Sequence, residues 1–112
     1  PKGVQLIWHE PSNATLKELP AEHFAHLTRA VRECLSNALR HANASKITVT
    51  ISLDSNNLTI SIVNDGATDG QKTNISGRGR SILQQRLESL GGQCTCEQQG
   101  NSWKVTLQAP LP

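Results

Sequence analysis

A long amphipathic pattern over residues 20–42 is the feature that most constrains the fold of this 112-residue chain. Proline at position 20 suits the first turn of a helix, where its missing N–H would have no partner in any case. Apolar residues then recur at helical spacing on one side. They are Phe24, Leu27, Val31, Leu35 and Ala38, with Cys34 at the edge. A helix of this kind fits a layered fold in which its apolar side is buried.

Alternating apolar and polar residues predict the strands. Residues 46–53 and 58–62 both alternate, and the turn sequence Asp-Ser-Asn-Asn between them predicts a hairpin. A second helix is predicted to end at Gly91 and Gly92, because glycine is common just after a helix C-terminus. The predicted order is strand 4–8, helix 20–42, strands 46–53 and 58–62, helix 81–90, and strands 93–98 and 103–109. This order predicts an α+β two-layer sandwich, a mixed sheet covered on one face by helices.

Composition limits the function. The net charge of +2 is too small to indicate a nucleic-acid binder, and no apolar run approaches the roughly 20 residues of a membrane span. An odd number of cysteines argues against a disulfide framework and for a reducing compartment, so we expect a cytoplasmic domain. The start at Pro1 rather than methionine leads us to expect one domain, residues 1–112, cut from a longer protein.

A polar stripe runs along the first helix. At about 100° per residue, Glu33, Asn37 and Arg40 fall in one narrow sector opposite the apolar side. A carboxylate, a neutral oxygen ligand and a guanidinium suit a metal-bound polyphosphate, and Mg²⁺ prefers oxygen ligands such as that of Asn37. His41, one position on, could also meet phosphate, or could simply occupy a helix C-terminus favoured by the helix dipole. The alternative for the stripe is ordinary surface, with Glu33 paired to Arg29.

Two glycine segments follow. Asn64-Asp65-Gly66 is a good turn sequence, and Gly66 would also let the backbone approach a ligand closely. Residues 65–79 lack periodicity, which predicts a mobile loop. Gly77 and Gly79, with Arg78 between them, precede the second helix, whose unpaired N–H groups suit a phosphate.

Three motifs together resemble a known family. Residues 32–42 (RECLSNALRHA) resemble the N box of sensor histidine kinases, and residues 62–66 (IVNDG) and 76–92 (SGRGRSILQQRLESLGG) resemble the two glycine boxes. Their order and spacing match as well, and the pattern is most similar to the nitrate/nitrite-sensor branch. The resemblance covers residues 4–107 and implies the Bergerat, or GHKL, ATP-binding fold.

The resemblance also implies an activity. ATP and Mg²⁺ would bind, and the γ-phosphoryl group would pass to a histidine on a separate dimerisation domain and then to a response regulator receiver domain. None of the four histidines here lies in the family's acceptor motif, and neither nucleic acid nor direct membrane contact is expected; the parent protein could be anchored in the inner membrane. By resemblance, Glu33 is catalytic, Asn37 is the Mg²⁺ ligand and Asn64 accepts from the adenine amino group. The predicted ATP-binding residues are Asn37, Arg40, His41, Asn64, Gly66, Gly77, Arg78 and Gly79.

This chain departs from the family pattern at three positions. Asn64 replaces an aspartate, Thr68 replaces a glycine, and Arg80 replaces a leucine. A neutral hydrogen bond is weaker than a charge-assisted one by enough to lower affinity about tenfold. These departures favour an alternative, a degenerate interaction module that binds nucleotide weakly or not at all.

Two other patterns suggest metal but are interpreted as structural. Cys94 and Cys96 share one face of a predicted strand and are expected in the core, while His23 and His26 lack further ligands at zinc-site spacing. Trp8 and Trp103 are expected to be strand residues packing an edge. Arg86 is expected to lie against the sheet or towards Glu88.

Overall fold

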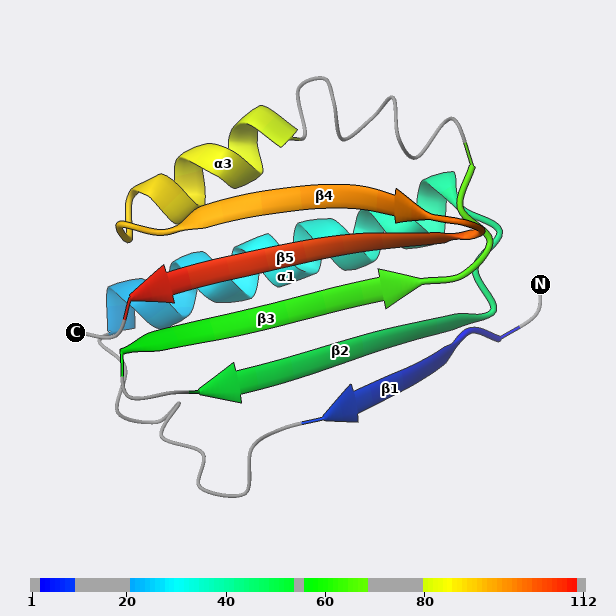
Figure 1. Cartoon of the computed structure of the whole chain (residues 1–112), viewed down its shortest axis with the longest axis horizontal. Coiled ribbons are helices and arrows are strands. Elements are labelled where there is room, and N and C mark those ends of the chain that lie inside the picture. Colours follow the sequence, from blue (N-terminus) through cyan, green and yellow to red (C-terminus); the bar gives the residue numbers. More distant parts are fainter. Residues whose placement is uncertain (1–2, 10–20, 54–55, 69–79, 111–112) are drawn as a thin grey trace.

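The computed structural model describes residues 3–9, 21–53, 56–68 and 80–110. They form a five-stranded sheet with helices on one face, and Figure 1 shows α1 running behind β3 and β5. The elements are β1 (Gln5–His9), α1 (Ala21–His41), β2 (Lys46–Leu53), β3 (Asn57–Asn64), α3 (Arg80–Glu88), β4 (Gln93–Gln99) and β5 (Ser102–Pro110). Neither described helix is both long and apolar enough to cross a membrane.

The sheet is mixed, as the sequence predicts. Its strand order is β1-β2-β3-β5-β4, with β1 parallel to β2 and every other neighbouring pair antiparallel. The predicted hairpin is β2–β3, in which Val49 pairs with Ile62 and Ile51 with Ile60. Because β1 and β2 are parallel, α1 serves as the connection between them, and its length matches the sheet that it crosses.

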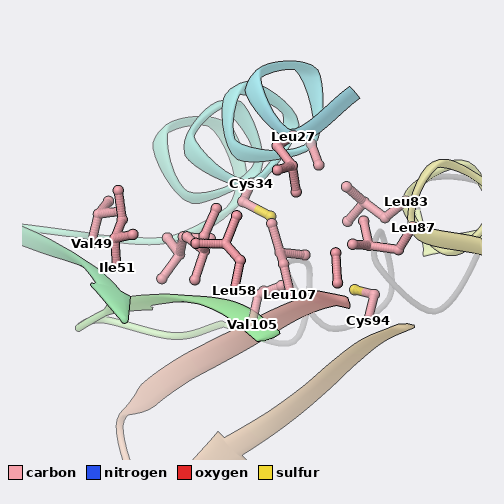
Figure 2. Close-up of a cluster of buried hydrophobic side chains, with 14 of the residues drawn as sticks. Leu27, Cys34, Val49, Ile51, Leu58, Leu83, Leu87, Cys94, Val105 and Leu107 are labelled. Carbon is pink, nitrogen blue, oxygen red and sulfur yellow. The ribbon is translucent and has the colours of Figure 1, made fainter. Parts of the chain in front are cut away.

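The core lies between the helices and one face of the sheet. Every second residue of β3 and β5 is buried, as period-2 alternation requires for a sheet with one packed face. Figure 2 shows Leu27 and Cys34 of α1 pointing towards the sheet, with Leu83 and Leu87 of α3 near Cys94. Each fully buried aliphatic side chain contributes about 1.5–3 kcal/mol, so this layer of side chains holds the two helices in place.

The second helix ends as predicted. The N–H of Gly92 donates to the carbonyl of Leu87 at 2.7 Å, and the N–H of Gly91 donates to that of Glu88 at 3.0 Å. Gly91 has a φ of 75°, in the left-handed region that glycine adopts at little cost. This is a Schellman motif, and it turns the chain from α3 into β4.

Two of the three aromatic residues differ from their expected positions. Phe24 is on the apolar side of α1 but is 55% exposed, and together with Trp8 it lines an apolar groove of about 440 Å³. Trp8 is on the edge strand β1, as expected. Trp103 is not at an edge, since β5 is flanked by β3 and β4, and only 4% of it is exposed.

The cysteines are thiols that belong to the core or its margin. Cys94 is buried and Cys96 is partly buried against the core, as their shared strand face predicts. Burial raises the pKa of the Cys34 thiol far above its ordinary value, and the nearby Cys96 and Glu33 add to this effect. Within the described residues, no three His, Cys, Asp or Glu side chains gather in a way that could hold a metal ion.

Candidate functional site

The polar stripe of α1 is only partly surface. Asn37 is 5% exposed, while Glu33 is partly buried and Arg40 is exposed. Asparagine is a poor helix former, and a buried amide must be hydrogen bonded to offset its desolvation. The alternative of an exposed helix asparagine is therefore excluded for Asn37.

A second buried asparagine lies at the end of β3. Asn64 is 2% exposed, and its Nδ2 donates to the backbone oxygen of Asp65 at 2.8 Å. In this bond the amide acts as a donor, whereas its oxygen is the acceptor of the side chain and thus the atom that a donor group of a ligand would meet. Asn37 and Asn64 are the two polar side chains buried in the described part of the chain, although 26 positions separate them along it.

Trp103 lies beside Asn64 in the sheet. The two residues are partners in the β3–β5 ladder, and both are buried on the helix-covered side. The indole Nε1 of Trp103 is buried and has no hydrogen-bond partner among the residues that the structure describes. An unsatisfied buried donor costs about 1–3 kcal/mol, so a ligand that brings an acceptor here would gain from it. Ring nitrogens of a purine are such acceptors, which makes this end of the sheet compatible with a nucleobase.

The segment after β3 is fastened to the end of α1. The N–H of Asn43 donates to the carbonyl of Gly66 at 2.8 Å, and the Thr68 hydroxyl donates to the carbonyl of His41. Gly66 has a φ of 63°, and a Cβ there would lie 2.1 Å from the Asn43 oxygen. Glycine is therefore required at position 66 by the fold itself. Its presence is no longer an argument for a nucleotide site, and Thr68 has a structural reason to replace glycine.

Asp65 forms a polar clamp that the sequence reasoning missed. Its carboxylate accepts from the N–H of Ser45 at 2.7 Å, from the Ser45 hydroxyl at 2.5 Å and from the N–H of Lys46 at 3.0 Å. The hydrogen bond from the Ser45 side chain, together with those from the two backbone N–H groups, lowers the pKa of Asp65. The only signal in the sequence was its place in a turn motif, which does not identify the partners.

Glu33 is paired across the helix layer. Both Nε and Nη2 of Arg86, in α3, donate to Glu33 Oε1, at 3.0 and 2.7 Å. The alternative in which Glu33 pairs with Arg29 of its own helix is therefore wrong, and Arg86 pairs with Glu33 rather than with Glu88. Packing of α3 against α1 places a guanidinium beside Glu33, and these two charge-assisted hydrogen bonds to one oxygen are stronger together than a solvated i,i+4 pair.

The residues of the predicted phosphate segment, Gly77, Arg78 and Gly79, lie outside the described residues, and α3 begins immediately after them at Arg80. His41 is the last residue of α1 and is partly exposed, so both interpretations of it stay open. The hydrogen bond from Asn43 to Gly66 and the pairing of Asn64 with Trp103 bring the end of α1, the end of β3 and the start of β5 together at one end of the sheet.

The chemistry of these residues is of the kind that a nucleotide with a bound cation would need. The oxygen of the buried Asn37 amide belongs to the class that Mg²⁺ prefers, and Asn64 and Trp103 carry an acceptor and a donor of the kind that a base would meet.

Known proteins resemble this chain in sequence and in fold. The sequence model of the family described as histidine kinase-, DNA gyrase B-, and HSP90-like ATPase matches residues 22–112. The nitrate/nitrite sensor protein NarQ of Escherichia coli K12 is 37% identical over 82 residues, which are 71% of this chain and 14% of NarQ. The corresponding sensor NarX of the same strain is 32% identical over 77 residues, or 68% of this chain and 13% of NarX.

A solved structure shows the same arrangement of elements. The blue-light activated histidine kinase EL346 of Erythrobacter litoralis superposes with a TM-score of 0.79 at 22% identity, covering 99% of this chain and 36% of that one. The chain spans well under half the length of each of these relatives.

Proposed function

This chain belongs to the histidine kinase-, DNA gyrase B- and HSP90-like ATPase family, and we propose that it binds Mg·ATP and supplies the catalytic site of a sensor histidine kinase. Its similarity to NarX and NarQ confirms the resemblance that the three motifs carry. In the proposed reaction the γ-phosphoryl group passes to a histidine on a separate dimerisation domain. A response regulator receiver domain is the proposed onward partner.

The burial of two asparagines carries this proposal. Asn37 and Asn64 come from different elements, and each occupies a position to which the motifs assign a ligand. A two-layer domain of this size could fill both positions with apolar residues and avoid the desolvation cost. Polar side chains at these two places are what a site for a cation and a base requires.

Each group of the chain has a defined task in this proposal. Asn37 holds the cation, whose charge offsets that of the phosphates when Mg·ATP is bound. The oxygen of Asn64 accepts from the base amino group, and the indole of Trp103 donates to a ring nitrogen. Glu33 orients the attacking nucleophile by accepting a hydrogen bond from it.

Calorimetry with a non-hydrolysable ATP analogue, with and without Mg²⁺, tests the proposal. We expect binding that Mg²⁺ strengthens, and loss of that metal dependence in Asn37→Ala. Asn56→Ala is the matched control, because Asn56 is an exposed asparagine next to the start of β3, at the other end of that strand from Asn64. Metal dependence that persists in Asn37→Ala would mean that another group is the ligand.

The alternative is a degenerate interaction module. It is favoured by Asn64 in place of aspartate and by the structural roles of Gly66 and Thr68, which need no nucleotide. No binding of the analogue at millimolar concentration, in a protein that is folded, would decide for this alternative.

A further inference from the structure

The ion pair between Glu33 and Arg86 joins the proposed catalytic carboxylate to a residue with no assigned role. Both donors of Arg86 meet the same oxygen, Oε1, at 3.0 and 2.7 Å. The second oxygen, Oε2, is not engaged by the guanidinium. One half of the carboxylate is therefore anchored, and the other half can face a substrate.

The surroundings make this pair more than a surface contact. The Arg86 and Glu33 side chains are 24% and 33% exposed, so water screens the pair only in part. Glu88, the acidic neighbour expected for Arg86, accepts instead from Gln84 Nε2 at 3.1 Å. Within the described residues, Arg86 is thus committed to Glu33.

The contact between Arg86 and Glu33 matters because α3 is packed against the core. Leu83 and Leu87 are fully buried, so the helix that carries Arg86 is held firmly against the core. The same helix starts directly after the glycine segment in which the sequence predicts phosphate contacts. Arg86 therefore fixes the Glu33 side chain relative to the helix that follows the phosphate segment.

We infer that Arg86 is a positioning residue: its guanidinium holds Glu33 Oε1 so that Oε2 stays directed at the nucleophile. This inference depends on the proposed function of the domain. Orientation of a catalytic group accounts for large rate effects, and a misplacement of about 1 Å can cost about 100-fold. Arg86 itself touches neither nucleotide nor acceptor in this scheme.

The test uses the complete kinase that carries this domain and its acceptor histidine. Rates of phosphoryl transfer and KM for ATP are measured for Arg86→Gln, Arg86→Lys, Glu33→Gln and the double variant Glu33→Gln/Arg86→Gln. We expect Arg86→Gln to lower kcat by about 10- to 100-fold with KM for ATP changed less than about twofold. Arg86→Lys should recover part of the loss, because it keeps the charge without the planar fork.

The double variant separates positioning from general stability. If Arg86 acts through Glu33, the double variant should transfer no more slowly than Glu33→Gln alone. Arg29→Gln is the matched control, an exposed arginine on α1 one turn before Glu33, and should leave kcat unchanged. The melting temperature and the affinity for the ATP analogue are measured for every variant.

Three results would overturn the inference. They are an unchanged or faster kcat in Arg86→Gln, additive losses in the double variant, and a loss that comes entirely from KM. A wild-type protein that binds no ATP analogue would instead reject the proposed function, and the inference with it.

Discussion

Single residues of the Asn-Asp-Gly sequence serve the fold as well as the proposed site. Asn64 is buried beside Trp103, Asp65 bonds back to the start of β2, and Gly66 packs against Asn43. Three consecutive residues thus have three different partners. A substitution in this motif that weakens nucleotide binding is therefore not by itself evidence of a ligand contact.

Replacing Gly66 by alanine tests the structural part of this argument. The new Cβ would overlap the Asn43 oxygen, and the residue would keep a positive φ, so we expect a loss of about 1–3 kcal/mol in unfolding free energy without nucleotide. Urea unfolding measures it. Gly100→Ala also has a positive φ but nothing within 4 Å, so the difference between the variants isolates the steric contact.

The Asp65 clamp makes a prediction about acid stability. Hydrogen bonds from Ser45 and Lys46 lower the pKa of Asp65 below its ordinary value of 3.8. Its charge therefore contributes stability above about pH 4, and this contribution is lost as the pH falls through the folded-state pKa. The stability difference between wild type and Asp65→Asn should be constant near neutral pH and should shrink below about pH 4. Glu97→Gln, on the exposed side of β4, is the control.

The contribution of Trp103 can be measured through its indole. Trp103→Phe removes the buried, unsatisfied Nε1 donor while keeping an aromatic ring in the core. If a base accepts from this group, affinity for the ATP analogue should fall about 5- to 10-fold, the value of one neutral hydrogen bond. Trp8→Phe, at an exposed edge strand, should bind like wild type. Equal affinities for both variants would remove Trp103 from the site.

At the scale of elements, the pattern of apolar residues predicted every strand and both described helices. The alternation of apolar and polar residues predicted a strand over residues 46–53, the same bounds that the structure gives. The two glycines after residue 90 located the cap of the second helix. The pairing of Glu33 with Arg86 could not be predicted, because it depends on how two helices separated by more than 30 residues pack together. Periodicity gives the buried side of each helix but not which polar residues meet across the boundary.

The glycine cap at the end of α3 should contribute measurably to the unfolding free energy of the domain. Gly91 has a φ of 75°, and a Cβ there would meet Pro110 at Cγ (3.5 Å) and Cδ (4.0 Å), which are ordinary contacts. Gly91→Ala should therefore cost about 1 kcal/mol, from the backbone conformation alone. Gln85→Ala, at an exposed position of the same helix, should be neutral or slightly stabilising, since alanine is the better helix former. Thermal unfolding of the two variants gives the comparison.

At the scale of the whole molecule, the two faces of the sheet carry different kinds of side chain. The helix-covered face carries the core and, at one end, the buried polar pair, while the opposite face is rich in threonine, serine and glutamine and is partly exposed. The sequence predicted this division, since strict alternation is possible only if one face meets water. The hydrogen bonds that join the end of α1 to the segment after β3 depend on how α1 crosses the sheet, which no local pattern specifies.

Neighbouring residues of β5 provide the sharpest test of the two-layer arrangement. Leu107 is 1% exposed and faces the helices, whereas Thr106 lies on the open face. Leu107→Ala should lower the unfolding free energy by about 2–5 kcal/mol, because it removes buried methyl groups and leaves a cavity. Thr106→Ala should change it by less than about 1 kcal/mol, the range of strand propensity on a solvated face. Similar losses in the two variants would mean that the open face is also packed, against a surface that a single layer of helices does not supply.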